Sequence, residues 1–216
     1  MEEFVLEKLV LIGGGGHCKS VLDAALSMNQ FEEIVITDAT MPESSTVLGC
    51  RVVGNDSILP KLRKQGFEYA CVTVGSIKSS DIRVKLAKMV AGLGFLCPVI
   101  IDSSACVSRY AVVEEGSFIG KHVVINADVH IGKHCIINTG SIIEHECSIG
   151  DHTHISVGSI ICGDSHVGNE SFIGAGSTVI QGIRIGEKVI IGANSTVLTN
   201  IENNMKCYGI INNRGV

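Results

Sequence analysis

The sequence contains no tryptophan, only three prolines and few aromatic residues, which make up 4% of its 216 residues. A core built around large aromatic side chains is therefore not expected. No apolar run approaches the roughly 20 residues that a transmembrane helix needs, so we expect no membrane span. The N-terminus carries acidic residues where a secretory signal carries basic ones, which predicts a cytoplasmic protein.

Long basic runs are also missing, and the formal net charge is −5, so nucleic acid is not an expected partner. The nine cysteines include no C-x-x-C pair, which favours free thiols packed as small hydrophobic side chains over disulfides or a zinc site. With 45% hydrophobic and 18% charged residues the chain can still bury a core.

A six-residue repeat fills the second half of the chain. Sixteen consecutive positions in steps of six, from Val107 to Val197, are Val or Ile, usually with a small residue two positions earlier and often with glycine one position later. A period of six fits neither an alternating strand nor a helix. It predicts a solenoid in which each hexad is a short strand plus a bend and three hexads make a triangular coil. Residues 18 apart then stack, the aliphatic side chain points inward, and the glycine tolerates the backbone angles of the corner. Roughly five coils span residues 101–200.

The first hundred residues alternate between strand and helix patterns. We expect strands at 8–12, 34–38 and 69–75 and helices at 18–28, 57–66 and 79–94. This order predicts a small Rossmann-like parallel βαβ sheet. The chain therefore divides into a Rossmann-like domain, residues 1–100, and a repeat domain with a C-terminal tail, residues 101–216.

A glycine run, Gly13 to Gly16, follows the first expected strand and precedes His17. Backbone N–H groups at the start of a helix suit a phosphate, and Asp38 at the end of the second strand is placed to hold a ribose hydroxyl. The third glycine of a G-x-G-x-x-G motif would fall on Cys18 or Lys19, which disfavours NAD-dependent redox chemistry. The run therefore predicts nucleotide binding.

The repeat carries one segment suited to acid–base chemistry, Glu144-His145-Glu146, with His154 nine residues after His145. An imidazole is suited to removing a proton near neutral pH, and a neighbouring carboxylate can orient it. Adjacent residues on a strand point to opposite faces, so Glu146 can assist His145 only if the chain bends there. Gly163 lies one coil beyond His145, and its backbone N–H is a candidate donor to the carbonyl oxygen of a thioester that reacts beside His145, where the lack of a side chain leaves room for that group.

The combination of GGGGHCKSVLD with NTGSIIEHECSIGDHTHISVG resembles the bacterial hexapeptide-repeat acyltransferases of the sialic-acid O-acyltransferase and UDP-N-acetylbacillosamine-type nucleotide-sugar N-acetyltransferase family. The resemblance implies a left-handed β-helix, assembled as a homotrimer with active sites between subunits. It implies acetyl-CoA as co-substrate, His145 as general base, Glu146 as the residue that raises its basicity, and His154 as an acetyl-CoA contact.

The same resemblance implies a nucleotide-sugar substrate held by the N-terminal domain. The residues that match are Gly15, Gly16, His17, Thr37, Asp38 and Gly75. The last turn of the family usually reads Y-G-x-P-A, whereas this chain reads Tyr208-Gly209-Ile210-Ile211-Asn212, so coenzyme contacts there are not carried over.

The leading interpretation is transfer of an acetyl group to the 4-amino group of a UDP-linked 4-amino-4,6-dideoxy sugar for bacterial surface glycans. The alternatives are O-acetylation of sialic acid or a related sugar and a non-catalytic hexapeptide-repeat scaffold. Among the eight histidines, His134 and His152 are 18 apart and should stack on the wall. The histidines are expected to be mostly outward polar residues, and no metal is expected.

Overall fold

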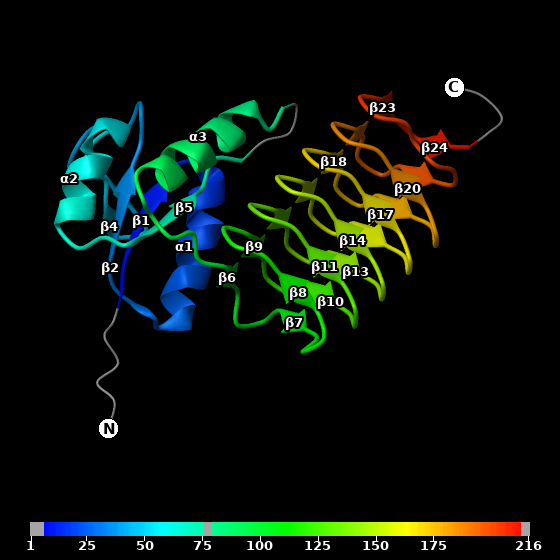
Figure 1. The fold of residues 1–216 in the computed structure, drawn as a ribbon, viewed down its shortest axis with the longest axis horizontal. Helices are drawn as coiled ribbons and strands as arrows, with labels where there is room; N and C mark the ends of the chain where they lie inside the picture. The colour runs from blue at the N-terminus through cyan, green and yellow to red at the C-terminus, as the bar shows by residue number, and fades with distance from the viewer. Residues whose placement is uncertain (1–6, 76–78, 213–216) are drawn as a thin grey trace. The chain divides into compact units, whose positions relative to one another are not determined.

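The computed structural model describes residues 7–75 and 79–212 and divides them into two compact units (Figure 1). Residues 7–75 and 81–100 form the first unit, and residues 79, 80 and 101–212 belong to the second. No helix in the described ranges is long and apolar enough to cross a membrane. Residues 1–6 lie outside the described ranges, and they include Glu2 and Glu3, on which the expected localisation partly rested.

The first unit is a three-stranded parallel sheet in the order β2-β1-β5. Its elements are β1 Glu7–Ile12, α1 Gly16–Met28, β2 Phe31–Thr37, β3 Thr46–Val47, β4 Cys50–Arg51, the 3-10 helix η1 Asp56–Ile58, α2 Leu59–Lys64, β5 Tyr69–Val72 and α3 Asp81–Gly92. The expected strands and helices are confirmed to within a few residues. The short antiparallel β3–β4 pair falls in a segment that the sequence left as loop or short strand.

Side chains of the sheet alternate between its two faces, as a buried strand requires. Val10, Ile12 and Val35 pack with Leu59 and Leu62 of the α2 segment, and the same cluster contains Val90 of α3. Helix α1 contacts β1 and β2 through an apolar side that buries Val21 and Leu22. The sheet is therefore covered by helices, and its loops at the carboxyl ends of the strands carry the glycine run.

The second unit is a parallel β-solenoid of three walls, each named here after one strand (Figure 1). The β13 wall contains β7 Cys106–Val107, β10 Val124–Ile125, β13 Ile142–Ile143, β16 Ile160–Ile161, β19 Thr178–Val179, β22 Thr196–Val197 and β24 Ile210–Ile211. The β14 wall contains β8 Val112–Val113, β11 His130–Ile131, β14 Ser148–Ile149, β17 His166–Val167 and β20 Arg184–Ile185. The β15 wall contains β6 Ile100–Ile101, β9 Phe118–Ile119, β12 Ile136–Ile137, β15 His154–Ile155, β18 Phe172–Ile173, β21 Ile190–Ile191 and β23 Lys206–Cys207.

The 18-residue stacking predicted from the repeat is confirmed, because Ile125 pairs with Ile143 and Ile143 pairs with Ile161. The solenoid has about six turns, one more than the expected five. The difference lies at the C-terminal end, where the step shortens: Ile191 pairs with Cys207, and Val197 with Ile211. A search in steps of six does not follow such a shortened coil.

The corner glycines have a different role from the one we expected. Positive φ occurs three residues after each inward aliphatic, in steps of six from Gly116 to Asn194, and includes many residues other than glycine. The glycines one residue after the aliphatic are instead required by space. A Cβ on Gly174 would lie 2.5 Å from the backbone nitrogen of Ala193 in the next coil. These positions are glycine because successive coils approach each other too closely for a side chain.

Replacing the inward Ile173, which is fully buried, by alanine is expected to destabilise the solenoid by about 2–5 kcal/mol, because it removes transfer free energy and leaves a cavity. Val112→Ala on the outside of the β14 wall, where the valine is exposed, should change stability by no more than about 0.5 kcal/mol. Denaturant midpoints of the two variants measure the difference. Equal midpoints would contradict a core formed by the inward aliphatic column.

Candidate active site

His145 lies at the corner between β13 and β14, and the backbone bends there as the candidate chemistry requires. Glu146 occupies the left-handed corner position with φ of 61°. The bend turns both side chains to one side, and Glu146 Oε2 lies 3.0 Å from His145 Nδ1. The two residues therefore do not point to opposite faces of a strand, since they lie on a corner and form a pair.

The pair is accessible to solvent, with side chains that are 54% exposed for His145 and 65% exposed for Glu146. A contact this exposed, which is an ion pair only when the imidazole is protonated, contributes at most about 1 kcal/mol to stability. Its effect is to orient the ring, because the carboxylate engages Nδ1 and leaves Nε2 for another partner. The contact thus leaves Nε2 of His145 without a hydrogen bond from the described residues.

Gly163 lies directly against the imidazole. A Cβ on Gly163 would approach Cε1 of His145 to 2.6 Å and Nε2 to 2.7 Å. The chains of the two coils are joined by the hydrogen bond from Asp164 N to His145 O, 3.0 Å long. The glycine therefore makes room for the ring, and any side chain at this position would displace it.

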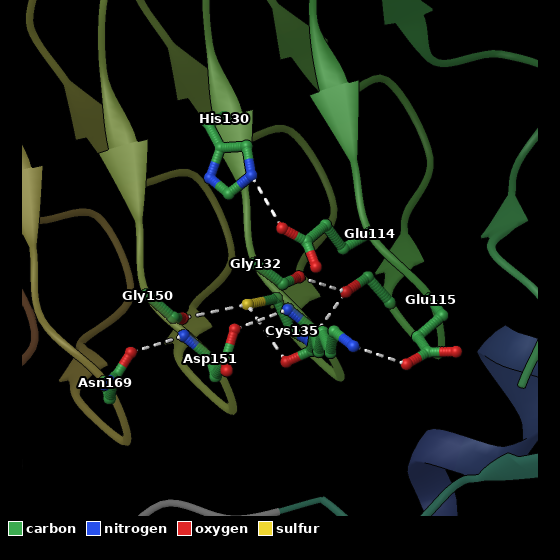
Figure 2. Close-up of polar contacts among 10 residues, drawn as sticks. Glu114, Glu115, His130, Gly132, Cys135, Gly150, Asp151 and Asn169 are labelled. Carbon is green, nitrogen blue, oxygen red and sulfur yellow. Dashed lines mark hydrogen bonds and ion pairs between the residues drawn. The ribbon is translucent and has the colours of Figure 1, made fainter.

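Backbone N–H groups at the corners differ in whether a side chain of the next coil accepts their hydrogen bond. In the column at the corner between the β14 and β15 walls, the side chain one coil further accepts the hydrogen bond: Asp151 Oδ1 from Lys133 N and Asn169 Oδ1 from Asp151 N, both at 2.8 Å (Figure 2). In the column of His145 the residue one coil beyond Gly163 is Gln181. Within the described part of the chain no acceptor is found for the Gly163 N–H. This N–H group is thus available to a ligand beside His145.

His154 is placed differently from His145. It belongs to β15, its side chain is buried, and its ring packs edge-on to Phe172 with centroids 5.1 Å apart. Asn138 Nδ2 lies 3.4 Å from its Nε2. The β15 wall is opposite the corner between the β13 and β14 walls, so one chain does not bring His154 and His145 together.

Cys147 follows the candidate pair but is a core residue. Its side chain is buried, and Sγ lies 3.2 Å from the carbonyl oxygen of Cys162. Burial raises the pKa of the thiol to about 11, which keeps it protonated near neutral pH. The segment therefore contains a base candidate and a packed thiol, in agreement with the packing predicted from the repeat.

The four glycines after β1 differ in how closely other residues pack against them. Gly13 has φ of +103°, and a Cβ on it would meet Val74, while one on Gly14 would meet Met41. For Gly15 and Gly16, in contrast, no atom of the described residues lies within 4 Å of an added Cβ. The first two glycines are therefore needed by the fold, and the next two leave open space at the start of α1.

The start of α1 is suited to an anion. Gly15 is its N-cap, no side chain from the described residues caps it, and its first turn contains no acidic residue. Gly75 borders the same turn, because a Cβ on it would lie 3.6 Å from the Cβ of His17. The structure thus brings Gly15, Gly16, His17 and Gly75 to one edge of the sheet, with orphan N–H groups that favour a phosphate.

Asp38 is close to this turn but is held by the protein itself. Its carboxylate accepts hydrogen bonds from the backbone N–H groups of Gly14, Thr40 and Met41 and from the Thr40 hydroxyl. Burial alone would raise the pKa of Asp38, but these hydrogen bonds outweigh it and lower the pKa to about 2. Thr37 is fully buried and donates its hydroxyl to Asp56 Oδ1 at 2.8 Å.

Sequence reasoning missed Asp56. It lies 18 residues beyond Asp38, after a hairpin, and nothing in the local spacing connects it with the glycine turn. A non-local contact does so, because Val52 forms a parallel bridge with Ile36 and the following residues run along the end of β2.

Histidines elsewhere on the solenoid agree with the repeat. The rings of His134 and His152 stack with centroids 5.1 Å apart and planes 4° from parallel, as the 18-residue spacing predicted. Over the described ranges no three His, Cys, Asp or Glu side chains form a group that could hold a metal ion.

Known families match both units. Residues 8–90 match the PglD N-terminal domain, and residues 110–145 and 164–199 match the bacterial transferase hexapeptide with its six repeats. A search of curated proteins found no match. The repeat and the corner site define a hexapeptide-repeat transferase.

Solved structures extend the match over nearly the whole chain. A point variant of perosamine N-acetyltransferase from Caulobacter crescentus, in complex with CoA and GDP-perosamine, is 34% identical, with 95% of each chain covered and a TM-score of 0.88. The acetyltransferase domain of PglB from Neisseria gonorrhoeae, in complex with acetyl coenzyme A, is 32% identical, with coverage of 94% and 96% and a TM-score of 0.88. WeeI from Acinetobacter baumannii, at 19% identity and a TM-score of 0.82 over 96% and 98% of the chains, shares the fold. The chain belongs to the family of hexapeptide-repeat sugar N-acetyltransferases with a PglD-type N-terminal domain.

Proposed function

We propose that this enzyme transfers the acetyl group of acetyl-CoA to the 4-amino group of a UDP-linked 4-amino-4,6-dideoxy sugar, with His145 as general base. The observation that carries the proposal is the corner site, in which Glu146 engages Nδ1 of His145 and Gly163 lies against the ring. The relatives named above are N-acetyltransferases by name, one bound to a nucleotide sugar and one to acetyl coenzyme A, which supports both substrates. The product would serve bacterial surface glycans, and the activated substrates favour a cytoplasmic site of action.

The chemistry needs no covalent enzyme intermediate. The neutral amine attacks the thioester carbonyl, and Nε2 of His145 takes the proton that the nitrogen loses as the C–N bond forms. Collapse of the tetrahedral intermediate breaks the C–S bond, and the protonated imidazole returns the proton to the leaving thiolate. The products are the amide and free CoA. Glu146 stabilises the imidazolium between these two proton transfers.

The charge that develops on the carbonyl oxygen needs a donor that is already in place. The Gly163 N–H fits this role, because the described residues supply no acceptor for it and because the glycine adjoins the ring of His145. Cys147 takes no part as a nucleophile, since it is buried and protonated.

We assign the nucleotide to the N-terminal unit. The diphosphate would lie over Gly15, Gly16 and His17 at the uncapped start of α1, with Gly75 leaving the turn open on its other side. Thr37 and Asp38 shape this edge from the end of β2. Uridine is the expected nucleoside, and guanosine is the competing one because a relative was solved with GDP-perosamine.

The separation of His145 and His154 supports a homotrimer with active sites between subunits. One chain places these residues on a corner and on the wall opposite it, so a coenzyme held by both requires a second chain. The outward positions of the β13 wall include Val124, Ile142 and Ile160, which are partly exposed apolar residues suited to burial against a neighbouring chain. In the trimer, His154 would contact the acetyl-CoA that lies over the His145 of the adjacent subunit.

Alanine at Gly15 or Gly16 is expected to raise the KM for the nucleotide sugar about ten- to a hundredfold, or roughly 1.4–2.8 kcal/mol, because the added methyl group occupies the space of the diphosphate. The fold should be unaffected, since no described atom is near either position. Gly92→Ala is the matched control, because Gly92 also has no neighbour within 4 Å among the described residues but lies in the last turn of α3. Steady-state kinetics with an unchanged KM in all three variants would contradict the proposed phosphate site.

The function is tested by supplying acetyl-CoA and UDP-, GDP- and dTDP-linked 4-amino sugars and following the release of free thiol, with the acetylated product identified by mass spectrometry. We expect rapid release with one UDP-linked amino sugar. Transfer to a hydroxyl group instead would support the O-acetyltransferase alternative. Absence of acetyl-CoA binding would favour a non-catalytic scaffold and overturn the proposal.

A further inference from the structure

We propose that Asp56, rather than Asp38, is the carboxylate that binds the ribose of the nucleotide sugar. The inference rests on the proposed function, because it names a residue of the same nucleotide site. The inference concerns the nucleoside of the substrate. The glycine turn does not explain how the nucleoside is bound, because N–H groups at the start of a helix bind phosphates.

Asp38 has the position expected of a ribose ligand, but most of its acceptor capacity is already used. Oδ2 accepts the Gly14 N–H at 2.8 Å, and Oδ1 accepts the N–H groups of Thr40 and Met41 and the Thr40 hydroxyl at 2.8–2.9 Å. A carboxylate offers about two acceptor sites on each oxygen, so the three donors occupy Oδ1 and one site remains on Oδ2 beside the Gly14 N–H. A ribose, which brings two adjacent hydroxyl donors, would find only that one site on Asp38. Asp38 therefore fixes the turn that presents Gly15 and Gly16.

Asp56 reaches the same edge of the sheet from a different segment. Val53 N donates to Ile36 O at 2.9 Å and Asp38 N donates to Gly54 O at 3.0 Å, which holds the segment along the end of β2. Asp56 follows directly, and its Oδ1 accepts the hydroxyl of the fully buried Thr37 at 2.8 Å. This hydrogen bond fixes the carboxylate without filling it, because no donor from the described residues reaches Oδ2.

The chemistry of a carboxylate indicates which part of the nucleotide sugar Asp56 binds. A carboxylate repels phosphate and accepts hydrogen bonds from O–H and N–H groups. A ribose offers two adjacent hydroxyl donors, and a carboxylate is the group that accepts from a ribose hydroxyl in dinucleotide-binding folds. The second possible donor, the N–H group of the nucleobase, is distinguished from ribose by the test.

The test is calorimetric binding of UDP, GDP and 2′-deoxyuridine diphosphate to the full-length protein and to Asp56→Asn. The side-chain oxygen of asparagine can still accept the hydrogen bond from the Thr37 hydroxyl. The thermal midpoint of the variant should therefore equal that of the wild-type protein. We expect Kd for UDP to rise about tenfold or more in the variant, as for the loss of a charge-assisted hydrogen bond. The preference for UDP over its 2′-deoxy form should then be lost. Asp38→Asn should instead lower the thermal midpoint, because it weakens the turn.

Unchanged nucleotide affinity in Asp56→Asn would overturn the inference. Weaker binding with the preference for UDP over the 2′-deoxy form retained would assign Asp56 to the nucleobase and overturn the ribose assignment. These results are separate from a failure of the proposed function, which would show as normal nucleotide binding without acetyl transfer to any amino sugar.

Discussion

His145→Ala is expected to lower kcat by about 10²–10⁴-fold, the usual contribution of a positioned general base. The reason is the corner geometry, which holds Nδ1 against Glu146 at 3.0 Å and leaves Nε2 for the amine of the substrate. The KM for the nucleotide sugar should change little, because the proposed nucleotide contacts belong to the N-terminal unit. Thiol release under saturating acetyl-CoA measures the effect.

The chain offers a matched control for this variant. His130 is also an exposed histidine paired with a glutamate, its Nε2 lying 2.7 Å from Glu114 Oε1 (Figure 2). It lies on the outside of the β14 wall, away from the corner that holds Gly163. His130→Ala should keep full activity. A loss of activity in His130→Ala equal to that in His145→Ala would show that removal of a histidine–glutamate pair damages the solenoid rather than the chemistry.

Gly163→Ala is expected to lower kcat by about 10²-fold, the usual cost of moving a catalytic group by about 1 Å, although the backbone N–H is retained. The added methyl group would come within 2.6–2.7 Å of the His145 ring and must displace it. A surface side chain can move at little cost in stability, so the thermal midpoint should be nearly unchanged. Gly174→Ala, in contrast, would meet backbone atoms of the next coil and should lower the midpoint.

A double-mutant cycle tests whether Gly163 acts through the imidazole. In the His145→Ala background the ring is absent, so the part of the Gly163→Ala effect that comes from displacing it should disappear. We expect the double variant to be only slightly less active than His145→Ala. Fully multiplicative effects of the two substitutions would mean that Gly163 contributes to activity independently of the ring.

Much of the solenoid is predictable because its order is local. An inward aliphatic every six residues specifies a strand and a bend, and the 18-residue stacking of Ile125, Ile143 and Ile161 follows from three hexads per coil. The same 18-residue spacing is sufficient to place Gly163 next to His145. The role of the glycines was predicted wrongly, because the repeat records where glycine occurs and not whether backbone angle or space requires it.

The sequence by itself determined the two-part architecture, the family, the candidate base and the glycine turn, since each depends on spacing along the chain. Only the tertiary structure decided three points. The left-handed backbone at Glu146 brings its carboxylate to His145, and the wall assignment separates His154 from that corner. Hydrogen bonds from neighbouring residues occupy one oxygen of Asp38 and part of the other, while one oxygen of Asp56 stays open. The physical reason is that hydrogen-bond capacity and side-chain direction depend on neighbours from other strands and coils, which no local pattern specifies.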